Sequence, residues 1–98
     1  PLRHVVDKAR GEMPVIYTQD RHRSNDAEFN VWPEHCIENS RGAEIIDELP
    51  KADYYIKKRR YSAFFATDLD LLLKELGIER IYLAGVATNI CVMHTAID

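Results

Sequence analysis

The chain has 98 residues, of which 46% are hydrophobic and 30% charged, and its formal net charge is −3. This length suffices for one small domain, and the slight acidity gives no electrostatic case for nucleic acid or an anionic membrane surface as a partner. No apolar run reaches the roughly 20 residues of a membrane-spanning helix, so we expect no membrane partner.

The first half of the chain predicts a helix, a strand and a long polar loop. Apolar residues fall at helical spacing over residues 2–10, and residues 14–19 are rich in β-branched and aromatic side chains. Residues 20–41 are polar and contain many residues that interrupt regular structure. A connection this long inside a compact domain is usually functional or disordered. A brief helix is predicted over residues 43–49.

The second half predicts four further elements: a strand over 53–58, a helix over 68–76, a strand over 80–86 and a helix from Asn89. Thr67 is the predicted N-cap of the middle helix, and Gly77 is its C-terminal glycine. The strand over 80–86 is apolar nearly throughout, as expected of a strand buried on both faces of a parallel sheet. The order of helices and strands predicts a layered α/β fold with a parallel sheet.

Two features indicate the cellular setting and the extent of the domain. Cys36 and Cys91 lie far apart and form no disulfide pattern, so we expect free thiols and a cytoplasmic protein. The sequence opens on residues typical of the middle of a helix and closes on a helix without a stop signal. We therefore interpret residues 1–98 as the central part of a single domain that is incomplete at both ends.

Cys91 lies where the last strand gives way to a helix, at the end of the sequence GVATNIC. Ligands bind beyond the carboxyl ends of the strands in such sheets. Free N–H groups and the positive end of the helix dipole would favour a thiolate there and make Cys91 a nucleophile. The alternative is that Cys91 is a small buried residue that packs against the sheet. Position alone does not decide between these interpretations.

Other polar residues are predicted at the same edge of the sheet. Lys58 ends the strand over 53–58, where its ammonium would stabilise a thiolate, although within KKRR it could equally be a solvated charge. The polar loop adds four candidate metal ligands: Asp20, His22, Glu28 and His35. Imidazole and carboxylate ligands of this kind suit zinc, iron or manganese, and the alternative is that they are ordinary exposed loop residues.

Five motifs extend over almost the whole chain: D-x-H at Asp20 and His22, W-P-x-H-C at 32–36, K-x-x-Y-S-A-F at 58–64, T-D-L at 67–69 and G-V-A-T-x-x-C at 85–91. Together they resemble the isochorismatase-like cysteine hydrolases, and among them the nicotinamidases and N-carbamoyl amide hydrolases. The resemblance implies an α/β fold, a doubly wound parallel sheet with helices on both faces. It also implies a catalytic Asp–Lys–Cys triad, in which Cys91 is the nucleophile and Lys58 the lysine.

The resemblance implies further roles around the nucleophile. The amides of Ala87 and Cys91 would form the oxyanion hole, next to a cis peptide between Val86 and Ala87. Trp32 and Tyr61 would line a pocket for a flat aromatic substrate, although both could equally be core aromatics. The triad aspartate of the family lies upstream of the residues matched here, and no aspartate of this chain takes its place. We therefore expect this polypeptide alone to be inactive.

The same resemblance implies a metal site. Asp20, His22 and His35 match the metal ligands of nicotinamidases. The usual second histidine of that loop is not seen, and Asp26 stands near its place, whereas Glu28 lies seven residues before His35, as a glutamate ligand does in some members. We prefer Glu28 to Asp26 as the fourth ligand. The implied cofactor is a divalent metal, zinc first, with iron and manganese as alternatives.

The resemblance implies hydrolysis of a small carboxamide through a thioester, first of all nicotinamide to nicotinate and ammonia, by a homo-oligomeric enzyme. True isochorismatases act on a vinyl ether and generally lack the cysteine, so Cys91 argues for an amide or carbamoyl substrate. The alternatives are an N-carbamoyl amide hydrolase or another hydrolase of the family, a metal hydrolase in which Cys91 only packs, and a non-catalytic binding or assembly module.

Overall fold

Two parallel strands form the centre of the structure, a computed structural model that describes residues 2–85 and 88–98. Strand β1 (Ile16–Asp20) pairs with β2 (Tyr54–Lys58) in a register that sets Ile16 opposite Tyr54 and Asp20 opposite Lys58. Because the strands are parallel, both end at the same edge of the sheet. The strands predicted over 14–19 and 53–58 are confirmed, with β1 shifted toward Asp20.

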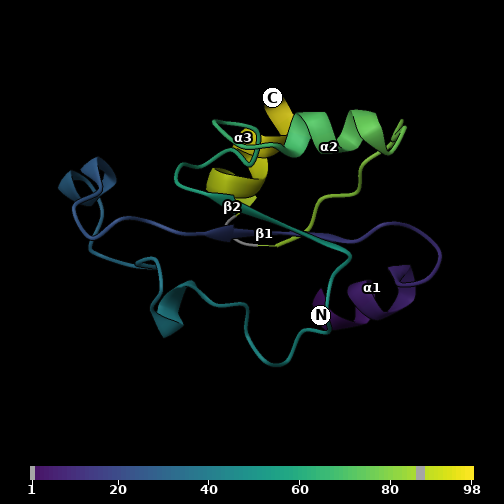
Figure 1. Cartoon of the computed structure of the whole chain (residues 1–98), viewed down its shortest axis with the longest axis horizontal. Coiled ribbons are helices and arrows are strands. Elements are labelled where there is room, and N and C mark those ends of the chain that lie inside the picture. The colour runs from purple at the N-terminus through teal and green to yellow at the C-terminus, as the bar shows by residue number, and fades with distance from the viewer. Residues whose placement is uncertain (1, 86–87) are drawn as a thin grey trace.

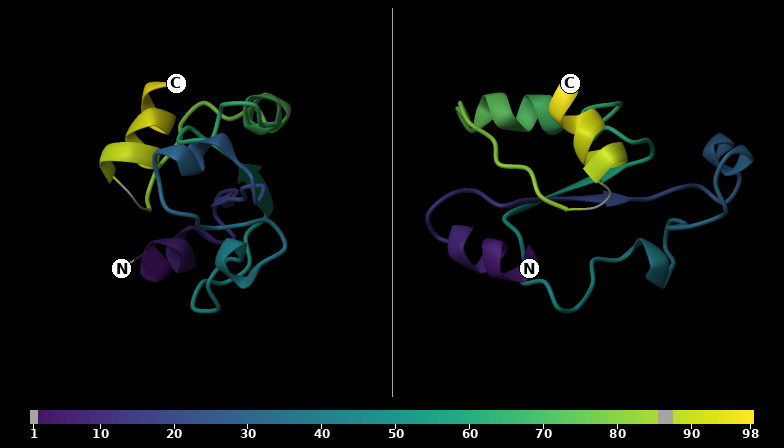
Figure 2. Two further views of the ribbon diagram at one scale, coloured as in Figure 1. Left: turned by 90° about the vertical axis from the view of Figure 1, so that its left-hand side faces the viewer. Right: turned by 180° about the vertical axis from the view of Figure 1, so that it is seen from behind.

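Helices cover both faces of this sheet (Figures 1 and 2). Helix α1 (Leu2–Ala9) lies on one face together with the short 3₁₀ helix η2 (Arg41–Ala43). Helices α2 (Leu69–Glu75) and α3 (Met93–Ile97) lie on the opposite face. The predicted α/β layering, with helices on both faces of a parallel sheet, is therefore confirmed.

Each face of the sheet has its own apolar cluster. The α1 side is built from Val6, Val15 and Tyr17, with Ala9, Ile45, Leu49 and Ala52 packed against them. The α2 side is built from Ile56, Ala63 and Leu69, with Ile16, Phe64, Leu72 and Leu73 packed against them. Ile16 and Tyr17 belong to different clusters because successive side chains of a strand point to opposite faces.

Helix α2 is one residue shorter at each end than the predicted 68–76, and Gly77 follows it as the predicted C-terminal glycine. Gly77 has a φ of +67°, and the amides of Ile78 and Gly77 donate to the carbonyls of Leu73 and Lys74 at 3.0 and 3.1 Å, which is a Schellman motif. The N-cap position belongs to Asp68, not to the predicted Thr67. The Thr67 hydroxyl instead donates to the Ala63 carbonyl while it accepts the Leu69 amide at 3.3 Å.

Two predicted elements are wrong. The helix over 43–49 is absent, because the chain leaves η2 with Glu44 in an extended conformation, φ −80° and ψ 154°. Residues 80–85 form no strand, since a strand requires a hydrogen-bonded neighbour and the described part of the chain provides none for them. Tyr82 is accordingly 76% exposed.

The last helix begins as a π-helical turn, η3 (Thr88–Val92), and continues as α3. The predicted start near Asn89 therefore holds to within one residue. Among the described residues, no helix has both the length and the apolar character needed to cross a membrane.

Candidate active site

Lys58 and Cys91 come from different elements and meet at the carboxyl edge of the sheet. Lys58 is the last residue of β2, and Cys91 lies in η3. The ammonium nitrogen Nζ of Lys58 lies 3.5 Å from the Cys91 sulfur and donates a hydrogen bond to it. The contact sets a cationic donor directly beside the sulfur of the candidate nucleophile.

Lys58 is a buried cation whose donors all have partners. Its side chain is only 5% exposed, so it is not the solvated charge that the run KKRR would suggest. Besides Cys91, Nζ donates to the carboxylate oxygen Oδ1 of Asp20 at 2.5 Å and to the Arg60 carbonyl at 2.9 Å. A lysine ammonium has three N–H donors, and these three contacts fix its position.

Thr95 connects the helix of Cys91 to the segment that follows Lys58. Its buried hydroxyl accepts a hydrogen bond from the Ala63 amide at 2.9 Å and donates one to the Cys91 carbonyl at 2.7 Å. Sequence reasoning missed Thr95. The available signal was a threonine inside a helix, four residues after the nucleophile, where its hydroxyl can reach the carbonyl one turn back.

Asp20, His22 and His35 converge beyond the carboxyl end of β1. Each offers one potential ligand atom, and these atoms lie within 4.8 Å of one another. Oδ2 of Asp20 is 3.9 Å from Nε2 of either histidine. Glu28, from the short 3₁₀ helix η1 (Ala27–Asn30), adds Oε2 at 3.2 Å from Nε2 of His22 and 3.8 Å from Nε2 of His35.

The two imidazoles present the same nitrogen to this cluster. Nδ1 of His35 contacts the Pro33 carbonyl at 2.8 Å, and Nδ1 of His22 contacts Asp26 at 3.0 Å. His22 is 1% exposed, and its Nε2, although 3.2 Å from Oε2 of Glu28, makes no hydrogen bond of acceptable geometry within residues 2–85 and 88–98. A buried nitrogen without a partner is costly, and a divalent cation would supply one. The donor set of imidazoles and carboxylates fits such a cation.

Glu28 and Asp26 take different places around His22. Glu28 faces the ligand cluster, while the carboxylate of Asp26 lies on the opposite side of the imidazole. Burial acts to raise the pKa of Asp26, but hydrogen bonds from the Glu28 amide, His22 and Arg60 outweigh it and hold that pKa well below its ordinary value. Asp26 is therefore ionised at neutral pH.

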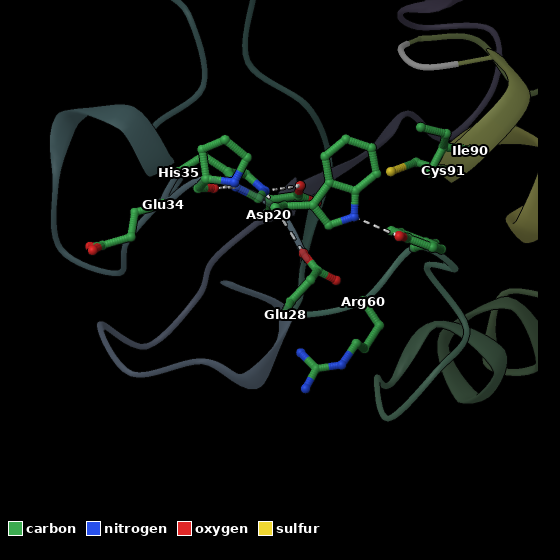
Figure 3. A pocket seen from close by; sticks show the side chains of 10 residues that line it. Asp20, Glu28, Glu34, His35, Arg60, Ile90 and Cys91 are labelled. Carbon is green, nitrogen blue, oxygen red and sulfur yellow. Dashed lines mark hydrogen bonds and ion pairs between the residues drawn. The ribbon is translucent and has the colours of Figure 1, made fainter. Parts of the chain in front are cut away.

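A single cavity of about 320 Å³ joins the Cys91 sulfur to the ligand cluster (Figure 3). Its walls are formed by Asp20, Glu28, Trp32, Pro33, Glu34, His35, Arg60, Tyr61, Ile90 and Cys91. Trp32 Nε1 donates to the Tyr61 hydroxyl at 2.7 Å, and the Tyr61 ring packs on His94 with centroids 5.3 Å apart. Both aromatic residues that sequence reasoning assigned to the pocket thus line this cavity.

The model of the isochorismatase domain matches residues 1–98, the full length of the chain. The chain belongs to the isochorismatase family.

Relatives in this family share both sequence and structure with the chain. A nicotinamidase of Acinetobacter baylyi (strain ATCC 33305 / BD413 / ADP1) is 39% identical over an alignment that covers 86% of this chain and 55% of the relative. N-carbamoylsarcosine amidase from Thermoplasma acidophilum superimposes with a TM-score of 0.92 at 39% identity, covering 99% of this chain and 58% of the other. Pyrazinamidase of Pyrococcus horikoshii, solved in complex with zinc, superimposes with a TM-score of 0.91 at 34% identity, covering 98% and 60%. The chain spans about half the length of the curated relatives it matches.

Two expectations about the isochorismatase-type site need comment. Sequence reasoning placed Asp20 in the loop, whereas it is the last residue of β1, with Oδ1 on Lys58 and Oδ2 toward the histidines. The predicted oxyanion hole and cis peptide involve Val86 and Ala87, which lie outside the described residues.

The two cysteines of this isochorismatase-family chain are both free but differ in setting. Burial raises the pKa of the Cys36 thiol, the Asp20 carboxylate raises it further, and Lys58 opposes both effects. Cys36 is thus held as a thiol at neutral pH, whereas Cys91 receives a hydrogen bond from the Lys58 ammonium. The free thiols expected from the sequence are confirmed.

Proposed function

We propose that the whole protein is a cysteine hydrolase that cleaves a small carboxamide through a thioester, with nicotinamide as the first candidate substrate. The observation that carries this proposal is the Lys58–Cys91 contact of 3.5 Å at the wall of a cavity that also holds three candidate metal ligands. The nicotinamidase and pyrazinamidase relatives support the choice of an aromatic amide.

In the proposed reaction the Cys91 thiolate attacks the carboxamide carbon. A C–S bond forms while the carbonyl electron pair moves onto oxygen, where the amides of Ala87 and Cys91 are the proposed donors. When the oxyanion collapses, the C–N bond breaks and its electron pair leaves with nitrogen, which takes up the proton that the thiol gave up. Water then attacks the thioester carbon and releases the acid and the free thiol. The triad aspartate implied by the family upstream of this chain is the proposed carrier of that proton.

The other residues of the cavity hold the substrate. The indole of Trp32 and the ring of Tyr61, joined by their 2.7 Å hydrogen bond, provide a rigid aromatic wall against which a flat ring can pack. A divalent cation held by Asp20, His22, Glu28 and His35 would supply a fixed positive charge and a coordination point for a ring nitrogen or water.

Replacement of each cysteine tests the nucleophile. In the whole protein, Cys91→Ala is expected to abolish ammonia release from nicotinamide while substrate still binds. Cys36→Ala is the matched control and should retain turnover, since Cys36 does not line the cavity. Turnover by Cys91→Ala would refute the proposal. If that turnover were also lost on chelation, the metal-hydrolase alternative would be favoured.

N-carbamoyl amide hydrolysis is the second candidate function. It is favoured by the likeness to N-carbamoylsarcosine amidase from Thermoplasma acidophilum, with a TM-score of 0.92. Ammonia release from nicotinamide and from an N-carbamoyl amino acid, measured side by side, separates the two. A higher kcat/KM for the carbamoyl compound would replace nicotinamide as the proposed substrate and leave the role of Cys91 unchanged.

A further inference from the structure

We propose that Asp26 is a positioning residue for the cation site: it orients His22 and Glu28 as ligands without binding the cation itself. This inference rests on the proposed function, because it requires that Asp20, His22, Glu28 and His35 bind a divalent metal. It assigns a different role to the residue that the sequence offered as the alternative fourth ligand.

Asp26 contacts the ring nitrogen of His22 that points away from the ligand cluster. A neutral imidazole has one N–H, and only its other nitrogen has a lone pair for a metal. Oδ2 of Asp26 lies 3.0 Å from Nδ1 of His22 and also accepts a hydrogen bond from the Arg59 guanidinium, so it acts as an acceptor toward the imidazole as well. This contact holds an N–H at Nδ1, and Nε2 is the nitrogen that faces Asp20, Glu28 and His35.

Asp26 also holds the backbone of Glu28. Asp26 is the N-cap of η1, and its Oδ1 accepts the Glu28 backbone amide at 2.9 Å. This bond fixes the start of the 3₁₀ turn that brings the Glu28 carboxylate to within 3.2 Å of Nε2 of His22. One carboxylate thus places two of the four candidate ligands, one through its ring and one through its backbone.

Asp26 is not itself a ligand. Its side chain is completely buried, and both oxygens already have cationic partners. Nη1 of Arg60 donates to Oδ1 at 2.8 Å, and Nη2 of Arg59 donates to Oδ2 at 3.3 Å. Two guanidinium groups at these distances neutralise the charge that would attract a further cation.

Asp26→Asn tests this role because it keeps the size of the side chain and removes its charge. An amide can present an N–H to Nδ1 of His22, which would shift the imidazole proton to Nε2. We expect the zinc affinity of the whole protein, measured by competition with a chromophoric chelator, to fall about 10- to 100-fold. Asp53→Asn is the matched control, since Asp53 also accepts a backbone amide, that of Val15 at 2.8 Å, but lies outside the ligand cluster.

The outcomes distinguish this inference from the proposed function. If the unaltered protein fails to bind zinc, the proposed metal site is refuted and the inference with it. If the unaltered protein binds zinc and Asp26→Asn binds it equally well, the inference alone is overturned. Loss of affinity in Asp26→Asn with normal affinity in Asp53→Asn supports it.

A second measurement needs no variant and holds even if Asp26→Asn fails to fold. The ¹⁵N shifts of the His22 ring in the zinc-free protein report which nitrogen carries the proton. We expect the proton on Nδ1 before zinc is added, because Asp26 holds it there. A ring without a proton on Nδ1 in the zinc-free protein would overturn the inference.

Discussion

Lys58 shows how a single side chain can belong to both the core and the chemistry of this molecule. It shares a face of β2 with Ile56, and the two are buried, while Lys57 between them is exposed. The Lys58 side chain thus lies on the same face of β2 as the apolar cluster of the α2 side, and its ammonium contacts the Cys91 sulfur there. A charge buried this way is tolerated only because each of its donors is satisfied.

Lys58→Met should remove this charge with little change in side-chain volume. We expect turnover to be lost and alkylation of Cys91 by iodoacetamide to slow about tenfold or more, because the nearby cation no longer stabilises the thiolate. The rate is measured by mass spectrometry of the Cys91 peptide, with Lys57→Met as the control. An unchanged alkylation rate in Lys58→Met would contradict the assigned role and would favour a non-catalytic module.

The sequence could predict the site where a residue type and its spacing carry the information. Asp20, His22, His35, Lys58 and Cys91 were all located this way, since motifs place them at strand ends and at one turn. It could not predict that Arg59 and Arg60 converge on a buried carboxylate, because which cations of a run are buried depends on three-dimensional neighbours. Asp26 was ambiguous for the same reason.

Among the elements, η3 and α3 depend on Thr95 for their position. The Thr95 hydroxyl accepts a hydrogen bond from the Ala63 amide and donates one to the Cys91 carbonyl. It therefore ties the backbone of Cys91 to the segment that follows β2. A π-helical turn at Thr88–Val92 departs from regular helix geometry at the same place. Irregular turns of this kind occur frequently at functional sites.

Thr95→Val keeps the shape of the side chain and removes both hydrogen bonds. We expect the free energy of unfolding to fall by about 1–3 kcal/mol, since the buried Ala63 amide loses its acceptor. We also expect kcat to fall while KM changes little, because the nucleophile is displaced but the aromatic wall is not. Urea unfolding and steady-state kinetics measure these effects, and Thr95→Ser should restore both. Thr18→Val, at an exposed position of β1, is the control.

Gly77 illustrates an element boundary that the sequence does determine. Its φ of +67° lies in the left-handed region, although a Cβ there would meet no atom within 4 Å. Gly77→Ala is therefore expected to destabilise the fold through backbone strain alone, by about 1–2 kcal/mol. Urea unfolding measures this, with Gly42→Ala as the control, where a Cβ would make only ordinary contacts. Equal stability of Gly77→Ala and the unaltered protein would contradict the Schellman assignment.

The predictions for other elements failed where local sequence does not decide the outcome. The strand over 80–86 was predicted from its apolar composition, but pairing depends on neighbours that local sequence does not specify. The helix predicted over 43–49 is absent, yet Ile45 and Leu49 reach the core from an irregular segment. For Ile45 and Leu49 the apolar character predicted contact with the core although the backbone is not helical, whereas Ile81, Tyr82 and Leu83 were expected to be buried and are exposed.

At the scale of the whole molecule, the segment over 80–85 presents an apolar surface. Ile81, Tyr82 and Leu83 are 51, 76 and 45% exposed, which is unusual for three successive large apolar residues. Such a surface is stabilised by cover from further structure, and its exposure opposes stable folding of residues 1–98 alone.

We therefore expect a polypeptide of residues 1–98 alone to self-associate and to unfold without a cooperative transition. Size-exclusion chromatography and a thermal scan followed by circular dichroism measure these properties. The charged variant Tyr82→Lys should reduce self-association if the exposed segment causes it. A monomer with a sharp thermal transition would contradict this expectation.

The split coordination of Asp20 has a consequence for how this site can change. One oxygen neutralises the lysine beside the nucleophile and the other faces the two imidazoles, so the two halves of the site share one unit of negative charge. A cation bound between the imidazoles would attract the Asp20 carboxylate and so weaken its ion pair with Lys58. Substitutions that alter metal preference and substitutions that alter cysteine reactivity should therefore be epistatic. A change to the ligand cluster is expected to require a compensating change near the lysine and the cysteine.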